Sequence, residues 1–189
     1  QFFMMNTSAF NQFCRNCGTR LEHRTPDDGD TKTRAVCPQE VCKTIHYVNP
    51  LNVVGTVPVW QDKVLLCRRA IEPRHGKWTL PAGFMELNET LAQGAARETT
   101  EEAGAQFEIG PLFTIVNVLK VGQVHFFYMA QLTSPVFDPG PESLEAQLFS
   151  EDEIPWSELA FHTVKHTLEQ FFADRKNNAP ATIHTIDLL

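Results

Sequence analysis

Apolar residues recur along the chain with two different spacings, and these spacings separate predicted strands from predicted helices. Runs rich in valine, leucine and phenylalanine occupy residues 51–60, 63–69, 106–119 and 124–132. Their lengths are typical of β-strands, and the Gln61-Asp62 turn predicts a hairpin between the first two. A further short strand is expected in the tail, at residues 181–189.

Two segments show helical spacing instead. The first leads from Asn88, a predicted N-cap, to Gly104, which is expected to end the helix as a left-handed cap. The second is expected to begin at a Ser157 cap and to end near Arg175, and its apolar residues are Phe161, Val164, Leu168, Phe171 and Phe172. Strands before and after two helices predict the α/β class, a sandwich with a mixed sheet.

The 189 residues suit one domain with a small attachment. The predicted division is an N-terminal segment 1–13, a cysteine-rich segment 14–46 and a main domain 47–189, because Asn49-Pro50 favours a turn at the junction. The residues before Met4 read as a processing or expression remnant.

Four of the five cysteines lie close together in the sequence, as two pairs separated by nineteen residues: Cys14, Cys17, Cys37 and Cys42. This spacing is typical of a four-cysteine zinc ribbon, in which two turns aim four thiolates at one Zn²⁺. A closed site of this kind is structural, because it leaves no open position for substrate. Two disulfides or four free thiols are the alternatives. The fifth, Cys67, lies in an apolar run and is expected to be a buried core thiol.

The net charge of −7 argues against broad nucleic-acid binding, so nucleic acid is not an expected partner. An anionic small substrate remains compatible with it, because a bound cation reverses the local field. No run approaches the length of a membrane span, and the uncharged start is too short for a secretory signal. A cytoplasmic or other reducing compartment is expected, with an organelle left open.

Three acidic residues share one face of the first predicted helix: Glu98, Glu101 and Glu102. Like charges at this spacing destabilise a helix, and a hard divalent cation would offset their repulsion. The alternative is a solvated acidic face, which would not account for the glycine loop before the helix or the single arginine within it.

The segment resembles the signature of the Nudix hydrolases, G-x5-E-x7-R-E-U-x-E-E-x-G-U, where U is a bulky apolar residue. The matching residues are Gly83, Glu89, Arg97, Glu98, Thr99, Glu101, Glu102, Gly104 and Ala105. Thr99 and Ala105 depart from the pattern, since an aliphatic residue is usual at the first and a bulkier one at the second. The resemblance implies the Nudix α/β/α fold and a site formed by the signature loop and helix.

The resemblance also implies residue roles. Glu98, Glu101 and Glu102 are expected to bind Mg²⁺ or Mn²⁺, Arg97 and Glu89 to pair and brace the loop, and Gly83 to provide its turn. Relatives often use a further glutamate, and Glu142 or Glu145 is expected to supply a ligand or the base. The alternative is that both are surface charges.

A zinc ribbon before a Nudix domain narrows the substrate class. The NADH pyrophosphatases carry a motif resembling SQPWPFPxS after the signature, and nothing like it occurs in residues 106–131. The chain is more similar to plant chloroplast-type enzymes that split FAD or ADP-ribose, for instance in residues 75–83 and 139–145.

The resemblance therefore implies hydrolysis of a nucleoside diphosphate linked to another group. The alternatives are an NADH pyrophosphatase, an enzyme that removes damaged nucleoside triphosphates, and a ligand-sensing module. A homodimer is the expected assembly, because relatives often form one.

Overall fold

The computed structural model describes residues 12–189, so the predicted segment 1–13 lies almost wholly outside the described residues. The chain divides into two compact units. One comprises the residues up to Pro50 together with Lys120–Gly122, and the other comprises Leu51–Leu119 and Gln123–Leu189. The division falls four residues after the boundary predicted from the sequence.

The first unit contains a small antiparallel sheet of three short strands: β1 (Glu22–Arg24), β2 (Arg34–Val36) and β3 (Ile45–His46). The four cysteines lie outside these strands, one pair before β1 and the other between β2 and β3. The sheet is too small to enclose an extended apolar core, and its buried cluster consists mainly of cysteines with Leu21 and Ala35.

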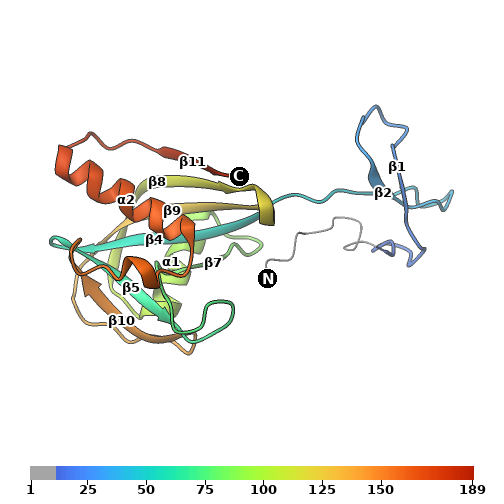
Figure 1. The fold of residues 1–189 in the computed structure, drawn as a ribbon. Coiled ribbons are helices and arrows are strands. Elements are labelled where there is room, and N and C mark those ends of the chain that lie inside the picture. The colour runs from blue at the N-terminus through green and yellow to red at the C-terminus, as the bar shows by residue number, and fades with distance from the viewer. Residues whose placement is uncertain (1–11) are drawn as a thin grey trace. The chain divides into compact units, whose positions relative to one another are not determined.

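The second unit is built on a mixed sheet of eight strands (Figure 1). Six follow the order β10-β5-β4-β9-β8-β11, while the short strands β6 and β7 pair with β5 and β4. Their bounds are Leu51–Trp60 (β4), Lys63–Arg69 (β5), Trp78–Thr79 (β6), Ala82–Phe84 (β7), Phe107–Val118 (β8), Gln123–Leu132 (β9), Ser143–Phe149 (β10) and His184–Leu188 (β11). The β4–β9 and β8–β11 pairs are parallel and the others antiparallel, which confirms the predicted mixed sheet.

The two helices, α1 (Leu91–Ala103) and α2 (His162–Asn177), cover opposite faces of this sheet (Figure 1). Side chains alternate between the faces along a strand. Thr56 of β4 contacts Thr99 of α1, whereas Val57 packs with residues of α2. The predicted three-layer architecture is therefore present.

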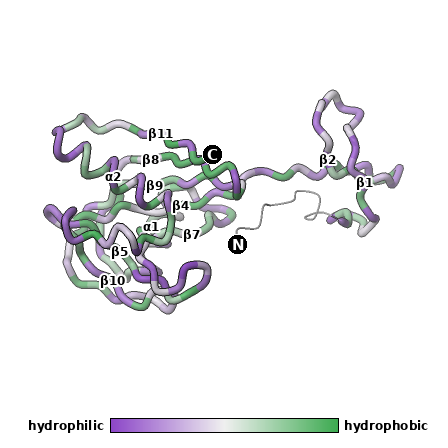
Figure 2. Tube along the Cα trace, viewed as in Figure 1, coloured by the Kyte–Doolittle hydropathy of each residue, from purple (hydrophilic) through white to green (hydrophobic). Residues whose placement is uncertain are grey.

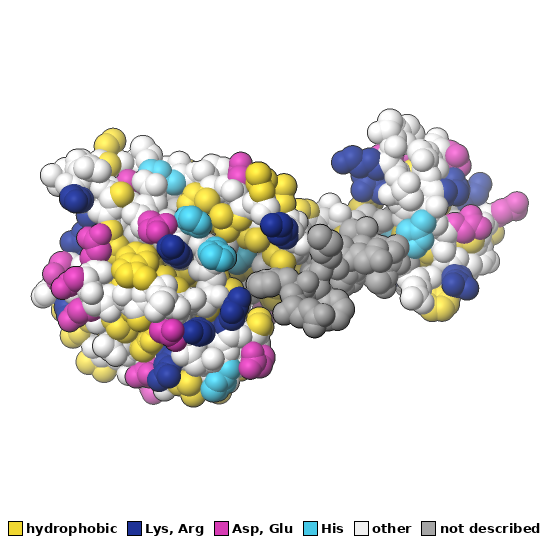
Figure 3. Space-filling model, viewed as in Figure 1, with side chains coloured by type: hydrophobic (Ala, Val, Ile, Leu, Met, Phe, Trp, Pro, Cys, Tyr) yellow, Lys and Arg dark blue, Asp and Glu magenta, His cyan; other side chains and the backbone are white. Residues whose placement is uncertain are grey.

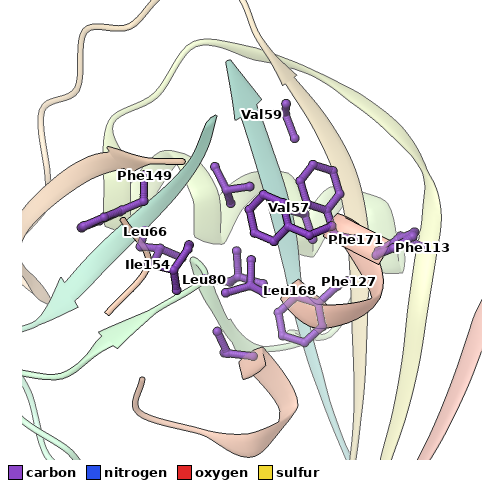
Figure 4. Close-up of a cluster of buried hydrophobic side chains, with 13 residues drawn as sticks. Val57, Val59, Leu66, Leu80, Phe113, Phe127, Phe149, Ile154, Leu168 and Phe171 are labelled. Carbon is purple, nitrogen blue, oxygen red and sulfur yellow. The ribbon is translucent and has the colours of Figure 1, made fainter. Parts of the chain in front are cut away.

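The main hydrophobic core lies between the sheet and α2 (Figure 4). It combines valines and leucines of β4 and β5 with Phe113, Phe127, Leu168 and Phe171, all less than a tenth exposed. Hydrophobic residues follow the strands, while many connecting loops are hydrophilic (Figure 2). Acidic and basic side chains are mixed over the visible face of this unit (Figure 3).

One local prediction is wrong, and the two elements described after it were not predicted. The N-cap of α2 is Phe161, with no side-chain cap, and Ser157 lies instead in a short 3-10 helix, Trp156–Glu158. A second 3-10 helix, Leu119–Val121, connects β8 to β9. Strand β10 occupies residues for which the sequence pattern indicated no strand, and it pairs with β5 at the edge of the sheet.

Within residues 12–189, no helix is long and apolar enough to cross a membrane.

Candidate active site

Helix α1 is held at both ends by local hydrogen bonds. Its N-cap is Thr90, whose side chain accepts from the Gln93 N–H while the Gln93 side chain accepts from the Thr90 N–H, a reciprocal capping box. The prediction of Asn88 as the N-cap is wrong, since Asn88 lies two residues before Thr90 in a left-handed conformation (φ 68°). Gly104 ends the helix with φ 58°, as predicted, and donates its N–H to Thr100 O.

The loop before α1 approaches the helix closely at Gly83. Gly83 pairs with Val54 in the β4–β7 ladder, and a β-carbon at this position would clash with the carboxylate of Glu98. Only glycine lets the backbone come so near. Gly83 therefore does not form the predicted turn: it lies in strand β7, where its missing side chain lets the strand approach an acidic side chain of the helix.

Arg97 connects the loop and the helix through five hydrogen bonds. Its Nε and Nη2 each donate to one carboxylate oxygen of Glu89 at 3.0 Å, a bidentate ion pair. Nη1 donates to Glu98 (2.7 Å) and to Glu101 (3.1 Å), and Nη2 also donates to the carbonyl of Phe84 (3.1 Å). These contacts lower the pKa of Glu89 and raise that of Arg97, so both stay charged.

The three signature glutamates have different environments. Glu102 is 7% exposed and accepts the Ala82 N–H at 3.0 Å. Burial, with smaller contributions from Glu98 and Glu142, raises the pKa of Glu102 to about 8. Burial also raises the pKa of Glu98, while the side chain of Glu101 is 59% exposed. One buried and one partly buried carboxyl, both with raised pKa values, thus lie beside an exposed third. A divalent cation would stabilise their ionised forms, which are the oxygen donors that it binds.

Glu142 and Glu145 are placed differently by the structure. Loop 134–142 packs on the end of α1, because Asp138 donates its N–H to Ala103 O (3.0 Å) and glycines at 104 and 140 permit close backbone contacts. This loop brings Glu142 near enough for its charge to raise the pKa values of Glu98 and Glu102. Glu145 instead forms an exposed ion pair with Arg68 at 3.0 Å.

Arg69 was not singled out from the sequence, although it is buried beside this acidic group. Its side chain donates from Nε to Pro73 O at 2.9 Å, lies over the ring of Phe161, and lowers the pKa of Glu102. The signal available in the sequence was a pair of arginines, Arg68-Arg69, at the end of an apolar strand. The pattern does not tell which of the two turns inward, since that depends on the pairing of β5.

The carboxylates satisfy part of what a divalent cation requires. Hard oxygen donors converge around Gly83, where the absence of a β-carbon leaves room beside Glu98. The donors are at present occupied by protein groups: Glu98 and Glu101 by Arg97, and Glu102 by Ala82. In the described part of the chain, the four cysteines are the one group of three or more ligand side chains whose atoms all lie within 4.8 Å of one another.

That cysteine group fits a tetrahedral thiolate site. Sγ of Cys14 lies 3.6 Å from Sγ of Cys42, and Sγ of Cys17 lies 3.5 Å from Sγ of Cys37. Hydroxyl groups of Thr19 and Thr44 lie within 3.4 Å of two of the sulfurs. All five cysteines are free thiols, and Cys67 is buried in the core of the other unit, as predicted.

Family models match both units of the chain. The NUDIX domain model matches residues 50–175, and the Nudix N-terminal zinc-ribbon model matches residues 12–48. A crystal structure of a NUDIX hydrolase from Nitrosomonas europaea is similar over 94% of this chain and 100% of its own, with 48% identity and a TM-score of 0.86.

Curated relatives are similar at lower identity. The mouse 8-oxo-dGDP phosphatase NUDT18 is 32% identical over 75% of this chain and 43% of its own. The NAD-capped RNA hydrolase NudC of Pseudomonas aeruginosa is 26% identical over 89% and 58%, and the chloroplastic Nudix hydrolase 19 of Arabidopsis thaliana is 30% identical over 72% and 26%. The chain spans about three fifths or less of these relatives' lengths.

The match of the domain model over two thirds of the chain, the intact signature and the fold lead to one conclusion: the chain belongs to the Nudix hydrolases, in the form that carries an N-terminal zinc ribbon.

Proposed function

We propose that Glu98, Glu101 and Glu102 hold Mg²⁺ or Mn²⁺ and that the site hydrolyses the diphosphate of a nucleoside diphosphate linked to a second group. FAD and ADP-ribose are the proposed substrates. The observation that supports this most is the buried Glu102 beside Glu98, both with raised pKa values, at the loop that Arg97 joins to the helix. When bound, the cation neutralises phosphate charge and makes a water molecule more acidic.

The chain's own residues do the remaining work. Water attacks one phosphorus, the bond from that phosphorus to the bridging oxygen breaks, and the water proton passes to a carboxylate. Glu142 is the proposed acceptor, because it is exposed and lies in the field of the two buried glutamates. FAD would give FMN and AMP, and ADP-ribose would give AMP and ribose 5-phosphate.

Two other roles follow from the geometry. Arg97 and Glu89 hold the loop against α1, so they position the acidic residues rather than react. The four cysteines hold one structural Zn²⁺, supported by the four-sulfur cluster and the zinc-ribbon match.

A second candidate is the hydrolysis of oxidised nucleoside diphosphates or triphosphates, which the similarity to an 8-oxo-dGDP phosphatase favours. An NAD-type substrate is the third candidate, which the similarity to an NAD-capped RNA hydrolase over 89% of this chain favours. A sensor without activity is disfavoured, since every signature glutamate is present.

A product analysis separates these candidates. The protein would be incubated with Mg²⁺ or Mn²⁺ and FAD, ADP-ribose, NADH, 8-oxo-dGDP or a triphosphate. The highest kcat/KM for FAD or ADP-ribose, with AMP as a product, is the expected result. A higher kcat/KM for an oxidised nucleotide or NADH would show that FAD and ADP-ribose are not the main substrates. Tight binding of a nucleotide without hydrolysis would show that the protein is a ligand sensor rather than an enzyme. Sedimentation of the same sample would test the proposed homodimer.

A further inference from the structure

Helix α1 and the central strand β4 are joined by two buried hydroxyl groups. Oγ1 of Thr56 lies 2.7 Å from Oγ1 of Thr99, and both residues are fully buried. Thr99 Oγ1 also donates to the carbonyl of Ala95 at 2.8 Å. A hydroxyl group carries one hydrogen. Because Thr99 donates its hydrogen to Ala95 O, Thr56 is the donor in the bond between the two threonines.

Elsewhere the buried face of α1 carries mostly small side chains, and Val54 of β4 packs close to Gly94. The buried residues of α1 are Gly94, Ala95, Thr99, Glu102 and Ala103, and none carries a large apolar side chain. On the other face, α2 buries Leu168, Phe171 and Phe172 in the main core. Large side chains that interlock fix the position of a helix, and α1 lacks them on its buried face.

A small displacement of α1 would move the acidic residues. One residue of helix rises 1.5 Å and turns by about 100°. Thr99 directly follows Glu98 and precedes Glu102 by three positions, so it shares their turn of the helix. Its bond to Thr56 links that turn directly to the central strand β4, beside the bond that Glu102 accepts from the Ala82 N–H of β7.

We propose that the Thr56–Thr99 hydrogen bond sets the rotation and height of α1 over β4 that place Glu98 and Glu102 for binding the divalent cation. Both threonines are positioning residues, since neither is proposed to touch the substrate. The inference rests on the proposed function, because it concerns the same carboxylates. It also gives a role to Thr99, the position at which the sequence departs from the aliphatic residue of the family signature.

Thr56→Val tests this most cleanly. Valine keeps the shape of threonine and removes only the donated hydrogen bond, while Thr99 keeps its bond to Ala95. Mn²⁺ affinity of the full-length protein, measured from the EPR signal of free Mn²⁺, is the readout, with thermal unfolding alongside. The expected result is a Kd for Mn²⁺ raised about tenfold, in the range seen when groups that orient metal ligands are removed.

The molecule provides a matched control. Oγ1 of Thr114 lies 3.1 Å from Oγ1 of Thr167, another fully buried pair, which joins β8 to α2. Thr114→Val removes a hydroxyl contact of the same kind away from the acidic helix, so Mn²⁺ affinity should be unchanged. Thr99→Ser keeps the hydroxyl and should retain parental affinity.

Parental Mn²⁺ affinity in Thr56→Val would overturn the inference. So would an equal loss of affinity in Thr114→Val, or a tenfold loss in Thr99→Ser. Equal affinities of the two variants compared next would overturn it as well. If Thr56→Val does not fold, Thr56→Ser and Thr56→Ala form that comparison, because they differ only in the hydroxyl. Serine should then bind Mn²⁺ about tenfold more tightly than alanine. An unmodified protein that binds no Mn²⁺ would instead refute the proposed function, and the inference with it.

Discussion

Glu89 and Arg97, eight residues apart, form a two-point ion pair in which both nitrogen–oxygen distances are 3.0 Å. Glu89 also accepts the backbone N–H of Glu86 at 2.7 Å, and Arg97 reaches the carbonyl of Phe84. The pair therefore ties the loop to the helix at several backbone positions.

Arg97→Lys is expected to lower kcat/KM about 100-fold, because a lysine ammonium cannot make the planar two-point contact and the loop would shift. Steady-state kinetics with the best substrate would measure this. The matched control is Arg68→Lys, since Arg68 pairs with Glu145 in an exposed contact and should tolerate the change. Equal effects of the two substitutions would refute the bracing role.

Glu142→Gln is expected to lower kcat by about 100-fold or more with little change in unfolding temperature, because a neutral amide cannot accept the water proton. Glu145→Gln is the comparison, since Glu145 is held in an exposed ion pair with Arg68. If Glu145→Gln were the slower variant, the assignment of the two glutamates would be reversed.

The pKa of Glu102 makes stability depend on pH in the protein without divalent cations. The folded-state value of about 8 lies above the ordinary value of 4.5, so between these pH values the folded state binds the proton more tightly than the unfolded state. The free energy of unfolding should therefore fall as pH rises from 4.5 to 8, by up to a few kcal/mol at about 1.4 kcal/mol per pKa unit.

Urea unfolding at pH 5 and pH 8, in buffer freed of Mg²⁺ but not of zinc, would measure this dependence. Glu102→Gln should flatten it, and added Mg²⁺ should restore stability mainly at pH 8, where the carboxylate is charged. Identical pH dependence in the parent and the variant would contradict the assignment of the buried proton to Glu102.

Zinc removal should affect the two units differently. Cys37→Ser is expected to lower the zinc content, measured by mass spectrometry, and to make residues 12–50 sensitive to protease, because their small core depends on the cysteine cluster. Mg²⁺-dependent hydrolysis by the larger unit should persist. A variant that stays protease-resistant but loses all activity would show that the ribbon is more than a structural attachment.

Much of the fold could be predicted because its patterns are local. Long strands such as β4 and β9 appear as apolar runs, and Gly104 marks the end of α1 by its residue type. The three strands of the first unit have two or three residues each, so they are too short to show the alternation of apolar and polar residues that predicts a strand. Strand β10 is an edge strand with mostly part-buried or exposed residues, so its apolar signal is weak.

The candidate site could be proposed from the sequence where one helix supplies its residues, and not where distant segments meet. Glu98, Glu101 and Glu102 follow from helical spacing, whereas the nearness of Glu142 depends on a loop packed on the end of α1. At the N-terminus of α1, two nearby residues each suited the N-cap position. Thr90 and Gln93 form a capping box that the sequence contains, but Asn88 two residues earlier also suits a cap.

Glu102 is the most deeply buried of the three carboxylates of α1 that we propose to hold the cation used in hydrolysis. The most direct test is the rate of AMP release from the best substrate by Glu102→Gln at saturating Mg²⁺, after circular dichroism has confirmed the fold. We predict a loss of at least about 100-fold relative to the parent protein, of the size expected when a group that supports transition-state charge is removed. Turnover within a few-fold of the parent would show that Glu102 does not hold the cation used in hydrolysis.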